Sequence, residues 1–168
     1  MSSRIRSGLP FCNCSRASTP LAAVSTLYPS IIHALHQDIP PQNELDAFAW
    51  IRDNTKPTAG VLALLEQGNL VTYVSQRRNL MDDNFGLVEN PEQRMEDLGR
   101  LYQTSFQTEA LRLLDEYNLN YLVLTPQALG HYQLQKFKYT TPDCFRKIYD
   151  KEGVRIYQVT CSLKRVLA

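Results

Sequence analysis

The chain has 168 residues, of which 43% are hydrophobic and 21% are charged, a length and composition typical of one globular domain with its own core. Its net charge of +1 provides no long-range field, so a nucleic-acid partner is not expected. No uninterrupted apolar stretch reaches the roughly 18 residues that a membrane-spanning helix needs, and the four cysteines are too few for a disulfide scaffold.

The first part of the chain, residues 1–37, differs in composition from the rest. Residues 1–20 have no hydrophobic period and are expected to be a disordered lead. Cys12 and Cys14 lie in it, but no second Cys or His pair follows at zinc-site spacing, so a metal is not expected. Residues 17–37 contain no Asp, Glu, Lys or Arg, and their apolar residues recur at near-helical spacing. This segment is expected to be either a membrane-proximal stalk or a strap on the folded domain.

The folded part begins with a predicted helix followed by two predicted strands. Asn43 can cap the helix, which should end before Pro57, because a proline disfavours helical geometry in the residue that precedes it. A buried strand is predicted at residues 61–65. A second strand, rich in β-branched residues, is predicted at residues 70–74.

The later elements alternate between helices and strands. They are a helix starting at Asn90-Pro91, a helix from about Thr108 to the left-handed stop Asn118, a strand at 121–124, a helix after Thr125-Pro126, and a hairpin of 145–149 and 154–159 around the loop 150–153. This order predicts an α/β fold: a small mixed sheet flanked by helices and ending in an antiparallel β-hairpin. We expect a single domain at residues 38–163 and a tail at residues 164–168.

Polar residues gather between and after the two predicted strands. Ligands of α/β domains bind where strands end, and a glycine there lets the backbone approach a partner closely. The adjacent Asp82 and Asp83 are expected to pair with Arg77 or Arg78. The candidate ligand-binding residues are Glu66, Gln67, Gly68, Asn69, Arg77, Arg78, Asp82 and Asp83. The alternative is that this stretch only connects two elements.

No motif of a known catalytic centre occurs in the sequence. It contains no G-x-S-x-G, no phosphate-binding loop, no G-x-G-x-x-G and no H-E-x-x-H. We therefore expect neither catalytic residues nor a cofactor in this chain.

Two cysteines, Cys144 and Cys161, flank the predicted terminal hairpin. If the two hairpin strands pair symmetrically about the loop 150–153, Cys144 lies close to Val159 and within two residues of Cys161. Small bulges can bring such a pair to disulfide distance, and an oxidising compartment would allow the bond. The alternative is that both thiols are buried and form no bond with each other.

Three segments, taken in order, carry a resemblance to a known family. Residues 47–55 resemble the pattern A-x-x-W-I-R-E-N-T-P, and residues 61–77 resemble V-L-S-W-W-D-Y-G-x-W-I-x-Y-x-x-x-R. Residues 144–159 resemble a terminal hairpin that follows these patterns. Together they resemble the extracytoplasmic domains of GT-C-type membrane glycosyltransferases, which include the catalytic subunit of oligosaccharyltransferase. The resemblance covers about residues 27–163, and the nearest look-alikes are archaeal.

The resemblance also implies what the chain does and does not do. In oligosaccharyltransferases the W-W-D-Y-G motif helps to hold the acceptor Ser or Thr, and the motif is degenerate here. The matching residues are Leu64, Leu65, Glu66, Gln67 and Gly68. The family's metal-binding and catalytic carboxylates lie in its membrane-embedded part and first outer loops, which this chain lacks. The resemblance therefore implies a domain that is catalytically silent by itself.

Two functions remain open. The first is an extracytoplasmic accessory or acceptor-binding domain of a multi-pass glycosyltransferase-like protein that uses polyprenyl-phosphate-linked sugars. Its partners would be the membrane-embedded transferase part and an acceptor polypeptide or glycan, at the extracytoplasmic face of the cell membrane. Membrane association would be indirect or through the N-terminal lead. The alternative is a free-standing α/β protein that binds a small ligand or a nucleotide at residues 66–83.

Overall fold

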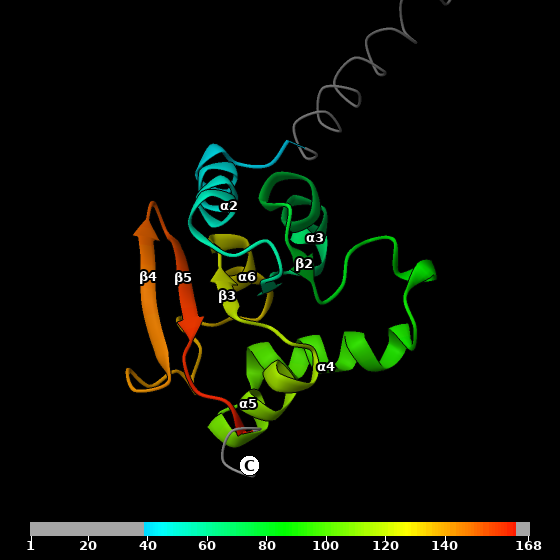
Figure 1. Cartoon of the computed structure of the whole chain (residues 1–168), viewed down its shortest axis with the longest axis vertical. Helices are drawn as coiled ribbons and strands as arrows, with labels where there is room; N and C mark the ends of the chain where they lie inside the picture. Colours follow the sequence, from blue (N-terminus) through cyan, green and yellow to red (C-terminus); the bar gives the residue numbers. More distant parts are fainter. Residues whose placement is uncertain (1–38, 164–168) are drawn as a thin grey trace, which may run out of the picture. The chain divides into compact units, whose positions relative to one another are not determined.

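The computed structural model describes residues 39–163, which form a five-stranded mixed sheet with helices on both faces (Figure 1). The helical segments are α2 Gln42–Asn54, the 3-10 turn η1 Leu65–Gln67, α3 Gly68–Leu70, the π-helical turn η2 Val71–Ser75, the 3-10 turn η3 Phe85–Leu87, α4 Pro91–Gln103, α5 Gln107–Glu116 and α6 Pro126–His131. The strands are β1 Gly60–Leu62, β2 Arg78–Asn79, β3 Tyr121–Leu124, β4 Phe145–Lys151 and β5 Val154–Val159. The predicted fold class is confirmed.

The sheet has the strand order β2-β1-β3-β5-β4. β1 runs parallel to both β2 and β3, whereas β5 runs antiparallel to both β3 and β4. The terminal hairpin turns more tightly than the expected four-residue loop, because β4 continues to Lys151 and β5 starts at Val154. Glu152 and Gly153 form the turn with φ of 50° and 85°, which matches the positive angles that a two-residue hairpin turn requires.

Side chains of the central strands alternate between two hydrophobic cores. Val61 and Val123 pack with Phe48 and Ile51 of α2. Leu62 and Leu122 pack on the other side with residues of α4, α5 and the segment after α6. This alternation is the period-two pattern of a strand that is buried on both faces.

The prediction of a strand at residues 70–74 is wrong, because this segment is helical. Val71 is fully buried against α2, and Ser75 of the same turn is also buried. β1 and β2 are parallel, and parallel neighbours need a crossover of a dozen or more residues between them. The helical segment supplies that crossover, so tertiary packing overrides the strand preference of the β-branched residues.

The helix starts differ in how well local signals predict them. Thr125 caps α6 as expected, since its side chain accepts a hydrogen bond from the amide of Ala128. Asn43 does not cap α2, because the helix already begins at Gln42. Asn90 precedes α4 but makes no side-chain cap, since its backbone is left-handed with φ of 51°.

Candidate functional site

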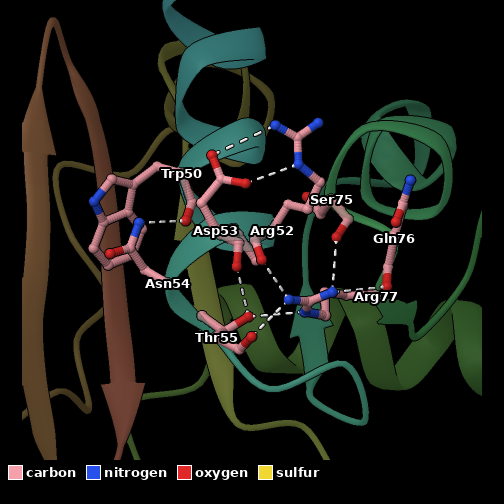
Figure 2. Close-up of polar contacts among 9 residues, drawn as sticks. Trp50, Arg52, Asp53, Asn54, Thr55, Ser75, Gln76 and Arg77 are labelled. Atoms are coloured by element: carbon pink, nitrogen blue, oxygen red, sulfur yellow. Dashed lines mark hydrogen bonds and ion pairs between the residues drawn. The ribbon is translucent and has the colours of Figure 1, made fainter.

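Arg77 lies at the centre of a hydrogen-bond network that joins the ends of two helical segments (Figure 2). Its Nη2 donates to the carbonyl oxygens of Arg52 and Thr55, both at 2.6 Å, and its Nε donates to Oγ1 of Thr55 at 2.9 Å. Its Nη1 donates to the carbonyl oxygens of Ser75 and Gln76 at 3.2 and 3.1 Å. The network ties the C-terminal end of α2 to that of η2, where unpaired carbonyls favour a positive charge.

Arg77 has no donor left for a ligand. A guanidinium carries five N–H donors, and the five bonds within the protein account for all of them. The residue is only 8% exposed. Its position is therefore that of a structural cation, although it was a candidate for ligand binding.

The expected pairing of Asp82 or Asp83 with Arg77 or Arg78 is wrong. The ion pairs within residues 39–163 include neither aspartate. Arg77 is turned toward the helix ends, and Nη2 of Arg78 donates to the carbonyl oxygen of Thr58 at 3.0 Å. Both guanidiniums thus have backbone partners, and the aspartates serve another purpose.

Asp82 and Asp83 organise the loop that follows β2. Asp82 accepts hydrogen bonds from the backbone amide of Asn84 at 2.9 Å and from Nδ2 of Asn79 at 3.3 Å. Asp83 accepts from Nδ2 of Asn69 at 3.4 Å. The contact with Asn69 places Asp83 at the predicted polar segment, residues 66–69. Asn79, which donates to Asp82, also donates to the carbonyl oxygen of Gly68 at 3.0 Å.

At Gly68 the two segments lie in close contact. A Cβ on this residue would lie 2.4 Å from the carbonyl oxygen of Met81 and 2.5 Å from Cβ of Asp82. Its φ of −55° is ordinary helical geometry, so close approach, and not backbone sign, requires a glycine here. The structure therefore brings residues 66–69 together with Asp82 and Asp83. The side chains of Arg77 and Arg78 lie elsewhere.

Replacing Gly68 with alanine is expected to lower the free energy of unfolding by about 2 kcal/mol, because the added methyl group overlaps backbone atoms. Gly99 is a matched control, since it also lies in a helix but a Cβ there would meet nothing within 4 Å. Gly99→Ala should stabilise the protein by about 0.5–1 kcal/mol. Urea unfolding of both variants measures the difference, and equal stabilities would contradict the close contact.

A buried polar cluster lies behind residues 66–69, at the carboxyl ends of β1 and β3. Nε2 of Gln67 donates to Oε2 of Glu44 at 2.7 Å and to Oγ1 of Thr125 at 2.9 Å. The three residues are 3% exposed or less. Sequence reasoning found Gln67 but missed Glu44 and Thr125 as its partners, because they are distant in the chain. Glu44 lies in the first turn of α2, where an acidic residue normally indicates only a favourable interaction with the helix dipole.

Burial of Glu44 predicts an unusual pH dependence of stability. Burial raises the pKa of its carboxyl, and the hydrogen bond from Gln67 lowers it by less. A carboxyl with a raised pKa in the folded state stabilises fully below its unfolded pKa, and this contribution is lost as the pH rises through the folded pKa. Glu44→Gln should therefore raise the free energy of unfolding at pH 7 by up to about 1 kcal/mol.

Denaturant unfolding between about pH 4 and pH 7.5 checks this expectation. The difference between Glu44→Gln and the unmodified protein should grow with pH. Glu89→Gln, a change at an exposed glutamate, is the matched control and should leave the profile unchanged. If the free energies of unfolding of Glu44→Gln and the unmodified protein changed in parallel with pH, the raised pKa of the buried Glu44 carboxyl would be contradicted.

Glu66 is an exposed acidic group of this region, and its charge acts on a nearby tyrosine. Burial raises the pKa of Tyr132, and the nearby charge of Glu66 raises it further. The half-buried Tyr132 stacks on Tyr102 with ring centroids 4.6 Å apart. Sequence reasoning missed Tyr132, which follows α6 and carries no local motif. Glu66 therefore lies near Tyr132, beyond the end of β1.

Arg77 and Arg78 line a separate groove of about 500 Å³ on the side of the edge strand β2. Arg94 of α4 and Tyr117 at the end of α5 form part of its wall. Residues 66–69 and the two aspartates do not line it. The eight candidate residues are therefore divided between two places in the fold.

Cys144 and Cys161 form a disulfide at the base of the terminal hairpin. Their Cα atoms are 4.9 Å apart, within the range that disulfides adopt. Both side chains are half-buried against the larger core. The bond fastens the end of β5 to the start of β4, next to the hydrogen bond from the amide of Thr160 to the carbonyl oxygen of Cys144.

Two further findings concern only the described part of the chain. No helix among residues 39–163 is long and apolar enough to cross a membrane. No three His, Cys, Asp or Glu side chains there are grouped so that they could hold a metal ion. The predicted lead at residues 1–37, with Cys12 and Cys14, and the predicted tail at residues 164–168 lie outside the described residues.

Comparison with solved structures identifies the fold. The C-terminal globular domain of oligosaccharyltransferase from Archaeoglobus fulgidus is similar with a TM-score of 0.54 and 14% identity, over 73% of this chain and 99% of that domain. The matched 73% of this chain therefore has the fold of an archaeal oligosaccharyltransferase C-terminal domain. No protein-family model and no curated protein sequence matches the chain.

Two longer structures from the same organism are also similar. An archaeal oligosaccharyltransferase in complex with an inhibitory peptide and a dolichol-phosphate has a TM-score of 0.43 and 19% identity, over 61% of this chain and 16% of that one. An oligosaccharyltransferase in complex with zinc and sulfate has a TM-score of 0.47 and 16% identity, over 83% of this chain and 22% of that one. The present chain thus spans less than a quarter of each of these two proteins.

Proposed function

We propose that this chain is an extracytoplasmic accessory or acceptor-binding domain of a multi-pass membrane glycosyltransferase-like protein that uses polyprenyl-phosphate-linked sugars. Its partners would be a membrane-embedded transferase part and an acceptor polypeptide or glycan. The domain would contribute no catalytic residue of its own. The observation that carries the proposal is the similarity of fold to the oligosaccharyltransferase C-terminal domain over 99% of that domain's length.

The polar turn after β1 supports the acceptor-binding part of this proposal. It follows the carboxyl end of a strand, where α/β domains bind their ligands. Gln67 and Gly68 are fixed from behind by the buried cluster and by Met81, so the exposed Glu66 is presented on a rigid base. Rigid support of this kind lowers the entropy cost of binding.

The disulfide supports an extracytoplasmic location. Disulfides persist in oxidising compartments and are rare in the reducing cytosol. A bond between Cys144 and Cys161 is therefore in keeping with a domain that faces the outside of the cell membrane.

Titration of the isotope-labelled protein with an Asn-x-Thr peptide, followed by NMR, tests acceptor binding. We expect the amide signals of residues 66–69, 82 and 83 to shift, and an Asn-x-Ala peptide to shift them less. Glu66→Ala should weaken the effect, whereas Glu96→Ala, a change at an exposed glutamate of α4, should not. Shifts caused by a free nucleotide and not by either peptide would instead favour the free-standing binding protein.

The purified chain is expected to show no glycosyl transfer from a lipid-linked sugar donor to an acceptor peptide. The resemblance to oligosaccharyltransferases implies that the metal-binding carboxylates belong to a membrane-embedded part and its first outer loops, outside the segments that carry the resemblance. The measurement is product formation with and without added divalent metal, and a complete transferase serves as the positive control. Metal-dependent transfer by this chain alone would overturn the accessory role.

A further inference from the structure

The groove beside β2 contains an excess of positive charge, which is unusual in a chain whose net charge is only +1. Arg77, Arg78 and Arg94 all line it, and Glu116 is its one acidic lining residue. Glu116 is already paired with Arg112, whose Nη1 lies 2.8 Å from Oε2 of the glutamate. We call this site the arginine groove.

None of the three guanidiniums has a carboxylate partner within residues 39–163. Arg77 uses all its donors inside the protein, so it contributes its charge and no contact. Arg78 uses one of its five N–H donors, in the bond to Thr58. Arg94 uses two, toward the carbonyl oxygens of Glu89 and Leu80. The remaining donors of Arg78 and Arg94 are available to a ligand.

Arg94 is held in place before any ligand arrives. Its guanidinium lies over the ring of Tyr117, with 5.5 Å between Cζ and the ring centroid. The Tyr117 hydroxyl donates to Oδ2 of the buried Asp97 at 2.7 Å, and burial with this bond raises the pKa of Tyr117 to about 12. The tyrosine therefore stays neutral and fixes the position of the arginine.

We propose that the arginine groove binds a phosphate group carried by an organic molecule. Arginine forks match the several acceptor oxygens and the double charge of a phosphate, whereas a carboxylate offers two oxygens and one charge. The volume of about 500 Å³ falls in the range of small-molecule sites and exceeds the needs of a bare ion. This proposal rests on the groove alone and does not depend on the proposed acceptor-binding function.

Isothermal titration of the full chain with glycerol 3-phosphate, and flotation with phosphatidylcholine vesicles with and without phosphatidate, test the proposal. The first probe reports a soluble phosphate and the second a lipid phosphate. Saturable binding of either probe is expected. Arg78→Gln and Arg94→Gln should each weaken it by about tenfold, the value of one lost charge-assisted bond, and Arg78→Lys should have a smaller effect.

Two further variants separate recognition from folding. Arg146→Gln removes an exposed arginine of β4 that lies outside the groove, and should bind as the unmodified protein does. Glu116→Gln should tighten binding by about threefold, because it removes the opposing charge, and a misfolded protein would not gain affinity. Absence of saturable binding to both probes, or unchanged affinity in Arg78→Gln and Arg94→Gln, would overturn the proposal.

Discussion

Replacing Arg77 with alanine is expected to lower the free energy of unfolding by about 3 kcal/mol or more. The substitution removes a buried guanidinium that binds the carbonyl oxygens of Arg52, Thr55, Ser75 and Gln76. Bonds from a charged donor contribute about 1.5–3 kcal/mol each, and buried acceptors left without a partner add a desolvation cost. The junction between α2 and η2 should loosen first, which hydrogen exchange can detect as faster exchange of amides in η2.

The neighbouring Arg78 provides the matched control for this experiment. It is exposed and makes a single hydrogen bond to the backbone, so Arg78→Ala should change stability by no more than about 0.5 kcal/mol. Arg77→Lys should recover only part of the loss, because an ammonium has three donors and no planar fork. If Arg77→Ala were as stable as Arg78→Ala, the network in Figure 2 would not be what holds the two helix ends together.

Removing the disulfide by the double substitution Cys144→Ser and Cys161→Ser should cost about 3 kcal/mol. In the chain-entropy model, a bond between residues 17 positions apart restricts the unfolded chain to this extent. Addition of a reductant to the unmodified protein should reproduce the loss. Unfolding by guanidinium chloride, with and without reductant, gives both values.

The other two cysteines serve as the control for the disulfide. Cys12→Ser with Cys14→Ser should leave unfolding unchanged, since neither takes part in the bond. Alkylation followed by peptide mapping should modify Cys144 and Cys161 only after reduction. Free thiols at both positions in protein made under oxidising conditions would remove the bond and also weaken the extracytoplasmic proposal.

Local signals in the sequence were sufficient for several elements. Thr125 followed by Pro126 specifies a helix start through one hydrogen bond and one fixed angle. Asn118 adopts the left-handed backbone expected after a helix, with φ of 52°. Such features depend on neighbours in the chain, so they can be read before the fold is known.

The segment at residues 70–74 shows where local reasoning fails. Its β-branched residues suit a strand, but the chain must cross from β1 to the parallel β2 over this distance. A helical turn makes the crossing and buries Val71 against α2. Intrinsic strand preference spans only about 1 kcal/mol, which burial of a single large apolar side chain exceeds.

The sequence by itself determined the α/β class and the terminal hairpin, because these follow from hydrophobic periods and from turn residues that act within a few positions. The order of its motifs carried the resemblance to oligosaccharyltransferase domains. Only the tertiary structure decided what the polar residues do. Arg77 finds two of its four partner residues 22 and 25 positions earlier in the chain, and Gln67 binds residues 23 and 58 positions away. Contacts of that range depend on how the helices cross the sheet. The eight candidate residues therefore separate into two places: the polar turn with its buried cluster, and the arginine groove with the helix junction at Arg77.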